Sequence, residues 1–386
     1  MVVVFPLLAL LLSAHPTSSG IPQGSFEQIA KRADAARAAD RMEDAIGLYT
    51  AGVRLRPSWS DGWWSLGSLF YDQDRFPEAE AAFKRFVALA PKSGPAYAFL
   101  GLCEYETKDY ERALQHLQTW SAKGFPGTTD LIDVAVFHWA LLLTRKGRFV
   151  ESLYLLAVEA GKLRGGPALV EAMGLASLRM PNLPEDYPPE RREMVWLAGE
   201  AALYSALPSN DSDRAAEYAR RLLFHYDHEP NVHYFRGTVL NFERKSAEAE
   251  EEFRQELQIS PRHVPAMVEL ARLNLSHDQT AEALSFAKSA AEIEPNNPEA
   301  HHMLGRVLLT TKQLPESARE LETAKQLAPD VASIRYHLAR AYAALGRAKE
   351  ADREVAAYHV LRDKQQVLAP PQEKLGALRK PTEPPE

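Results

Sequence analysis

The sequence of 386 residues contains a single cysteine, no excess of basic residues and no apolar run long enough to span a membrane. One thiol excludes an intramolecular disulfide, and the apolar neighbours of Cys103 favour a small buried side chain over a reactive one. The net charge of −7 argues against DNA or RNA as a partner, because such binding needs a basic surface. We therefore expect neither a transmembrane segment nor a nucleic acid partner.

Sequence signatures of catalysis and metal binding are missing too. The chain has no G-x-x-x-x-G-K-[ST], H-E-x-x-H, C-x-x-C or G-x-S-x-G motif. The adjacent His301 and His302 would point about 100° apart on a helix, which is a poor geometry for sharing a metal. Three histidines gather near one predicted helix end, and we interpret them as polar loop residues, with a metal site as the alternative: His225, His228 and His233. These absences predict a non-catalytic protein without cofactor or metal.

The first twenty residues, MVVVFPLLALLLSAHPTSSG, contain no Asp, Glu, Lys or Arg. Val2 to Leu12 form an apolar run of the length found in signal peptides, and Ala14 and residues 17–20 offer candidate cleavage sites. No Lys or Arg precedes the apolar run, which departs from the usual pattern. We interpret residues 1–20 as a signal peptide and expect export to a bacterial envelope, as a periplasmic or secreted protein. An uncleaved anchor and an artefact of start-site choice are the alternatives.

The main positive feature of the sequence is a repeat of 34 residues. Prolines recur at this step: Pro57 and Pro91, then Pro261, Pro295 and Pro329. Two series of small residues do the same: Ala45, Ala79 and Ala113, then Ala249, Ala283, Ser317 and Ala351; and Gly67 and Gly101, then Gly237, Ala271, Gly305 and Ala339. A bulky series reads Tyr49, Phe83 and Leu117. Several registers with one common period predict a repeated structural unit.

Each register has a physical reason in a pair of antiparallel helices. Gly or Ala at the crossing lets the two helices approach closely, and the bulky residue one turn after the small one fills the space between units. Proline ends the second helix, because it lacks an N–H and disfavours helical backbone in the residue before it.

These residues resemble the tetratricopeptide family, most closely over residues 61–91, and the resemblance covers nearly all of residues 26–360. It implies an all-α fold, a TPR-type α-solenoid whose antiparallel helix pairs stack into a right-handed superhelix with a concave binding surface.

The repeat pattern predicts five segments. They are a signal peptide (1–20), an N-terminal TPR block (25–128), degenerate TPR units (129–229), a C-terminal TPR block (230–367) and a disordered Pro-rich tail (368–386). In the degenerate segment we expect helices over 168–180 and 215–226, and a return of helical patterning near Met194. Between them the stretch PNLPEDYPPERRE cannot be a helix because of its four prolines. This irregular connection near 180–192 either bends the solenoid as a hinge or is a passive loop insertion.

A candidate binding surface lies on first helices of the C-terminal block. Arg272, Arg306 and Arg340 recur at the 34-residue step, each two residues after an apolar packing position and therefore about 200° away from the buried side. First helices line the concave groove in tetratricopeptide proteins. Four further residues share this predicted face: Tyr234, Asn241, His302 and Tyr336. Because Arg can form paired hydrogen bonds to a carboxylate, the ladder predicts a groove for an extended acidic or C-terminal peptide segment.

The N-terminal block has a different predicted lining, formed by Trp64, Tyr71 and Tyr105, which would suit a more apolar ligand. Packing between units is an equally physical explanation of these aromatic residues. The function predicted overall is a non-catalytic scaffold or adaptor that binds a protein or peptide partner in its concave groove. Two alternatives remain: an enzyme or metal-binding protein with a site in the irregular 165–230 segment, and a purely structural repeat protein that associates with itself.

Overall fold

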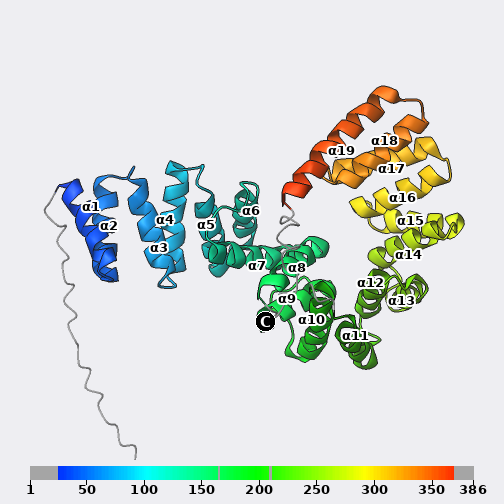
Figure 1. Cartoon of the computed structure of the whole chain (residues 1–386), viewed down its shortest axis with the longest axis horizontal. Coiled ribbons are helices and arrows are strands. Elements are labelled where there is room, and N and C mark those ends of the chain that lie inside the picture. The colour runs from blue at the N-terminus through cyan, green and yellow to red at the C-terminus, as the bar shows by residue number, and fades with distance from the viewer. Residues whose placement is uncertain (1–24, 164–165, 208–210, 369–386) are drawn as a thin grey trace, which may run out of the picture. The chain divides into compact units, whose positions relative to one another are not determined.

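The computed structural model describes residues 25–163, 166–207 and 211–368. In these ranges it contains 19 α-helices, one short 3₁₀ helix and no strand (Figure 1). The predicted all-α solenoid fold is confirmed. None of the described helices is long and apolar enough to cross a membrane. The predicted signal peptide lies outside the described residues, and so do residues 369–386 of the predicted tail.

The chain divides into two compact units, residues 1–135 and 136–386. The division falls within α7 (Thr129–Arg145). In the first unit six helices precede α7, and each packs against the next within and between successive pairs: α1 (Phe26–Ala38), α2 (Met42–Leu55), α3 (Ser60–Tyr71), α4 (Phe76–Leu89), α5 (Gly94–Glu106) and α6 (Tyr110–Ser121). The N-terminal unit is therefore built from three helix pairs, as the repeat predicts.

The second unit continues with α8 to α19, and successive helices again pack on one another. Their bounds are α8 (Phe149–Leu163), α9 (Pro167–Ser177), α10 (Arg192–Ala206), α11 (Ser212–Tyr226), α12 (Val232–Phe242), α13 (Ser246–Ile259), α14 (Val264–Ser276), α15 (Thr280–Ile293), α16 (Pro298–Thr310), α17 (Leu314–Leu327), α18 (Ala332–Ala344) and α19 (Ala348–Leu368). The first helices of neighbouring pairs also touch, since α14 packs on α16 and α16 on α18. Their side chains can therefore build one continuous surface.

The recurring small residues lie where the pattern places them. A Cβ atom on Gly67 would come within 2.7 Å of the Phe83 ring, and one on Gly305 within 2.6 Å of Leu321 Cγ. At these two crossings the first helix carries no side chain, which leaves room for a bulky residue of the second helix. Pro57 and Pro91 follow α2 and α4 by two residues, so proline ends the second helices as predicted.

The turns inside the helix pairs contain a register that the sequence patterns did not reveal. A residue with positive φ follows the first helix at the 34-residue step: Asp40, Asp74 and Lys108, then Arg244, Asp278, Lys312 and Gly346. In each case the next residue's N–H reaches back to a carbonyl five residues earlier, as from Arg75 N to Phe70 O at 2.9 Å. The backbone geometry is shared although the side chains are not, so residue identity gave no signal.

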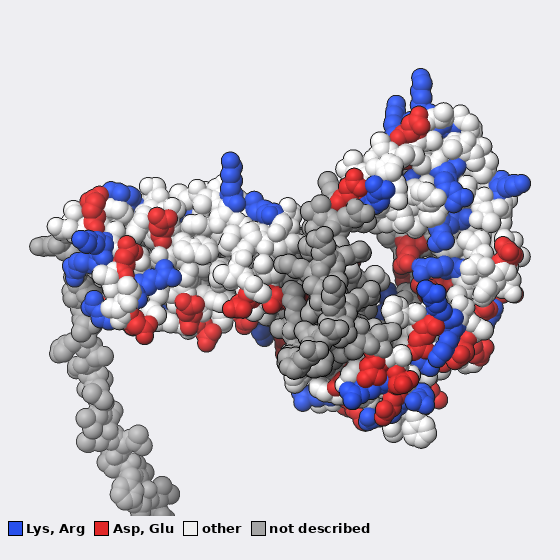
Figure 2. Space-filling view, viewed as in Figure 1, with Lys and Arg blue, Asp and Glu red and all other residues white. Residues whose placement is uncertain are grey.

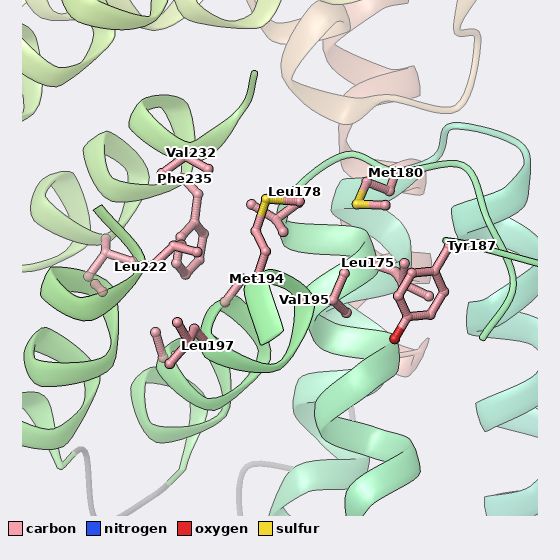
Figure 3. Close-up of a cluster of buried hydrophobic side chains, with 14 residues drawn as sticks. Leu175, Leu178, Met180, Tyr187, Met194, Val195, Leu197, Leu222, Val232 and Phe235 are labelled. Carbon is pink, nitrogen blue, oxygen red and sulfur yellow. The ribbon is translucent and has the colours of Figure 1, made fainter. Parts of the chain in front are cut away.

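The irregular middle segment is packed rather than open. Residues 181–188 are not helical, as expected, and the 3₁₀ turn Pro189–Arg191 leads into α10, which begins at Arg192, inside the stretch that was predicted to be non-helical. The predicted helix over 168–180 ends earlier, at Ser177, because Arg179 adopts a left-handed conformation with φ 52°. Leu183 is fully buried, and the Tyr187 hydroxyl donates to Glu171. Figure 3 shows Met180 and Tyr187 of this connection beside the apolar side chains of α9 and α10.

The helices α9 and α10 approach each other more closely than any side chain would permit. A Cβ atom on Gly174 would lie 2.0 Å from Val195 O, and one on Gly199 would lie 1.9 Å from Val170 O. Each glycine therefore faces the backbone of the opposite helix. This reciprocal contact fixes the spacing of two helices that line the site described below.

Candidate functional site

A polar pocket of about 330 Å³ lies on α14, α16 and α18 in the C-terminal unit. Three of the predicted groove residues, Arg272, His302 and Arg306, line it together. Two further residues of the lining, Glu299 and His337, were not among those predicted. The repeat step thus brings side chains from neighbouring units to one concave feature.

Arg272 is held by two carboxylates. Its Nη1 lies 3.1 Å from Glu269 Oε1, one turn back on α14, and its Nη2 lies 3.2 Å from Glu299 Oε1 on α16. The guanidinium therefore joins two repeat units through charge-assisted hydrogen bonds. Its charge is already compensated within the chain.

Arg306 has no such compensation. Among the described residues no carboxylate forms an ion pair with it. Its Nη1 donates a hydrogen bond to Met303 Sδ at 3.8 Å. Burial lowers the pKa of the Arg306 guanidinium, and the positive charges of Arg272 and Arg340 lower it further. A half-buried cation between two other cations is a favourable place for an anion to bind.

Two histidines form the far wall of this pocket. His302 Nε2 lies 2.9 Å from His337 Nδ1, and His337 Nδ1 also lies 2.8 Å from Ser333 O. Because a carbonyl only accepts, His337 Nδ1 carries the proton and His302 Nε2 accepts. Burial lowers the pKa of His302 to about 3 and that of His337 to about 4, with the nearby arginines adding to the effect. Both rings are neutral at pH 7.

An apolar pocket of about 590 Å³ adjoins the polar one. Its walls come from α8, α9, α10 and α12, and most of them are hydrocarbon: Phe149, Val150, Leu153, Met173, Ala202, Ala206, Phe235, Val239 and Phe242. Its volume falls within the range of about 300–1,000 Å³ that is usual for ligand pockets. Glu269 lines this pocket and is the ion-pair partner of Arg272, so the two pockets meet at that pair.

The lining of the apolar pocket also includes polar and charged groups, among them Tyr234, Glu269 and Arg179. Tyr234 is buried there, and burial raises the pKa of its hydroxyl. Burial also raises the pKa of Glu269, whose Oε2 is buried without a hydrogen-bond partner. Arg179 lies over two aromatic rings, with Cζ 4.8 Å from the centre of Phe149 and 5.5 Å from that of Tyr234.

A third pocket, of about 780 Å³, borders the other two in the same unit. It shares Phe149, Val150 and Arg179 with the apolar pocket and Glu299 with the polar pocket. Its remaining walls are the turn before α8 and the turn before α16. Because the three pockets share lining residues, we treat them as one surface and call it the C-terminal trough.

Three of the predicted groove residues do not line these pockets. Asn241 lies near the end of α12, half-buried, while Tyr336 and Arg340 are exposed on α18. Arg340 Cζ is 5.8 Å from the Tyr336 ring centre, and Tyr336 also packs against Tyr358 of α19. Tyr336 and Arg340 therefore extend the surface past the trough, and Arg340 still contributes its charge to Arg306.

The aromatic residues predicted as an apolar lining of the N-terminal unit pack on other rings. Trp64 lies 5.2 Å from Phe86 and 5.7 Å from Phe99, and Tyr71 lies 5.1 Å from Phe99, between ring centres. Tyr105 is buried. Packing between helices accounts for these contacts, and a ligand-binding role for the three residues stays a prediction.

Sequence reasoning missed Arg179, Glu269 and His337. Glu269 had a local signal, because it lies three residues before Arg272 on one helix face. His337 had none, since its partner is in the preceding repeat. Arg179 lies in the irregular connection, where no repeat register applies, and only the pocket formed with α8, α9, α10 and α12 gives it a role.

The candidate metal ligands lie apart in the structure. His233 bonds Glu252, His228 bonds Asp227, and His301 bonds Glu320. No group of three metal-ligating side chains occurs in the described ranges.

Cys103 is buried as expected, and burial raises the pKa of its thiol to about 12. On the face in Figure 2 basic and acidic side chains lie side by side over the C-terminal helices.

Two family models described as tetratricopeptide repeat match the chain. One matches residues 31–94 and 65–124, and the other matches residues 274–332. The matches fall on α1 to α6 and on α14 to α18, the stretches with the strictest 34-residue spacing. No match was found among curated proteins.

Several solved structures are similar to part of the chain. MamA from Desulfovibrio magneticus RS-1, from its residue 41 to its end, is 19% identical over 45% of this chain and 97% of that one, with a TM-score of 0.39. YrrB, described as a TPR protein with an unusual peptide-binding site, is 18% identical over 50% of this chain and 94% of that one, with a TM-score of 0.36.

Proposed function

Because the chain is a protein that contains tetratricopeptide repeats, we propose that it is a non-catalytic scaffold that holds an acidic peptide segment of a partner protein in the C-terminal trough. Tetratricopeptide-repeat proteins are generally interaction scaffolds. The observation that carries the proposal is Arg306, which is half-buried, flanked by two cations and paired with no carboxylate among the described residues. An incoming carboxylate would supply the missing counter-charge.

The neighbouring groups support the same ligand. Arg272 lines the same pocket and its positive charge acts on Arg306, while His302 and His337 are neutral and do not change the charge of the pocket. A terminal carboxylate and an Asp or Glu side chain have the same chemistry here. The pocket therefore recognises a carboxylate, and the surrounding trough accommodates the extended chain that carries it.

Arg306→Ala should weaken the binding of acidic peptides about tenfold, because a charge-assisted hydrogen bond is removed. The measurement is enrichment from an array of random 12-residue peptides, followed by fluorescence polarisation on the selected sequences and on their Glu→Gln counterparts. Arg319→Ala is the matched control, since Arg319 is 72% exposed on α17 and its partner is the nearby Glu316.

Equal binding of acidic and amide peptides by the parent protein would contradict the proposal, and so would an unchanged affinity of the Arg306→Ala variant. The self-association alternative makes a different prediction for the same samples. It requires a mass that grows with protein concentration in light scattering, with no peptide selected.

We also propose that the chain is exported to a bacterial envelope compartment. The support is the uncharged apolar run Val2–Leu12 and the small residues after it. N-terminal sequencing of the protein from its native host should then begin after residue 14 or close to residue 20. Recovery of a chain that still starts at Met1, in the cytoplasmic fraction, would refute export.

A further inference from the structure

The apolar pocket has features of a binding site that packing alone does not require. Two large apolar side chains at its mouth are mostly exposed, Val150 at 68% and Phe242 at 69%. They stand on α8 and α12, two of the helices that line the pocket. Exposed apolar side chains around an apolar pocket favour ligand binding, because covering them removes apolar surface from water.

The charged residues of the pocket indicate the chemistry of its ligand. Glu269 Oε2 is a buried acceptor without a donor, while Arg179 offers donors and has no ion-pair partner among the described residues. A peptide group presents one N–H and one C=O within a few ångströms, and can serve both. A fatty acid would bring its carboxylate close to Glu269 and would supply no donor.

The apolar pocket borders the polar pocket, so a ligand with an apolar group in the first should carry a polar group for the second. The ion pair between Glu269 and Arg272, 3.1 Å long, forms the border between the apolar and polar pockets. A ligand that fills the first pocket and continues along the trough therefore reaches Arg306 next. The order of the two cavities fixes the order of two kinds of side chain in the ligand.

We propose, on the basis of the peptide-binding function above, that the partner segment is bipartite: a bulky apolar side chain fills the apolar pocket and an acidic group a few residues away binds at Arg306. The apolar side chain anchors the segment, and its backbone amide meets Glu269 and Arg179. The carboxylate sets specificity. This assigns a second binding site to the trough and a two-part motif to its ligand.

Three variants separate the two sites. Ala206→Phe places a ring inside the apolar pocket, Phe242→Ser removes apolar surface from its mouth, and Arg306→Ala acts on the polar pocket alone. Phe224→Ser is the matched control for Phe242→Ser, because Phe224 is an 83% exposed phenylalanine on α11 that does not line the pocket. Phe242 is exposed, so its replacement should leave the fold intact even if Ala206→Phe does not.

The random 12-residue peptide array should select sequences that contain Trp, Phe, Leu or Met a few residues from Asp or Glu. Binding of the selected peptides should weaken about tenfold in Ala206→Phe and several-fold in Phe242→Ser, while both variants keep their preference for Glu over Gln. Arg306→Ala should lose the acidic preference and keep the apolar one. Phe224→Ser should bind as the parent does.

Two results would overturn the bipartite motif while sparing the peptide-binding function: selection of acidic peptides with no apolar preference, or an apolar preference that neither pocket variant alters. Tight binding of dodecanoate that Ala206→Phe abolishes, with no peptide displacing it, would assign the pocket to a lipid chain instead. If no peptide is selected at all, the peptide-binding function itself fails.

Discussion

Replacing Gly199 by alanine should lower the free energy of unfolding of the C-terminal unit by about 3 kcal/mol. The new Cβ would lie 1.9 Å from Val170 O, and a backbone carbonyl inside a helix cannot move aside as a side-chain tip can. Gly174→Ala should act similarly through Val195 O. Urea unfolding followed by circular dichroism measures both effects.

The matched control is Gly161→Ala in α8. A Cβ atom there would meet no atom within 4 Å, so the substitution should stabilise the helix by up to about 1 kcal/mol. The sign of the effect thus differs between two glycines of one unit. If Gly199→Ala unfolds at the parent's urea concentration, α9 and α10 do not cross as closely as described.

Gly199→Ala should also alter ligand binding in the apolar pocket. Met173 of α9 and Ala202 of α10 line the apolar pocket, and both helices must separate to accept a methyl group at the crossing. We expect weaker binding of apolar-anchored peptides in Gly199→Ala even at temperatures where the variant remains folded. The acidic preference set by Arg306 should persist.

Lowering the pH from 7.5 to 5 should destabilise the C-terminal unit, on the order of 1 kcal/mol for each of three partly buried histidines once solvent screening is allowed for. Burial lowers the pKa of His263 to about 4, of His302 to about 3 and of His337 to about 4, below the ordinary value of 6.5. Above pH 6.5 both folded and unfolded chains are neutral at these sites. Below it the unfolded chain takes up protons first, so stability falls as the pH approaches 4.

His263 shows why the neutral ring is needed. Its Nδ1 accepts from Ala266 N at 3.0 Å, which caps α14, and its Nε2 donates to Asn231 Oδ1 at 2.9 Å. A second proton on Nδ1 would remove the cap. His263→Asn keeps a capping acceptor without a titrating ring, so its stability should depend less steeply on pH between 6.5 and 5.

Other groups in this unit titrate with the opposite sign. A hydrogen bond to Glu252 raises the pKa of His233, so its stabilising contribution is present at low pH and lost as pH rises through that value. Burial raises the pKa of Glu269, which also favours the folded state on acidification. His228→Gln is the control, because His228 is 82% exposed. A pH dependence between 7.5 and 5 that His263→Asn leaves as steep as in the parent protein would contradict the assignment of a neutral His263 ring.

Much of the fold followed from local sequence because the repeat restates the same requirement every 34 residues. The 34-residue spacing predicted close helix approach at Gly67 and Gly305. It also predicted that proline follows the end of each second helix. The candidate polar pocket was partly predictable for the same reason, since Arg272 and Arg306 occupy one register. The irregular segment was less predictable, because Ser177 ends its helix early and no repeat register covers Arg179.

The sequence alone determined that this is a chain of helix pairs with an arginine on successive first helices, since helical periodicity and close crossing depend on nearby residues. Only the tertiary structure decided that Phe149, Arg179 and Phe242 surround one apolar cavity, and that this cavity borders the arginines at Glu269. Those residues belong to α8, α12, α14 and the connection that follows α9, which are separated along the chain. A local pattern specifies which face of a helix is buried, but the stacking of several helices specifies which exposed faces meet.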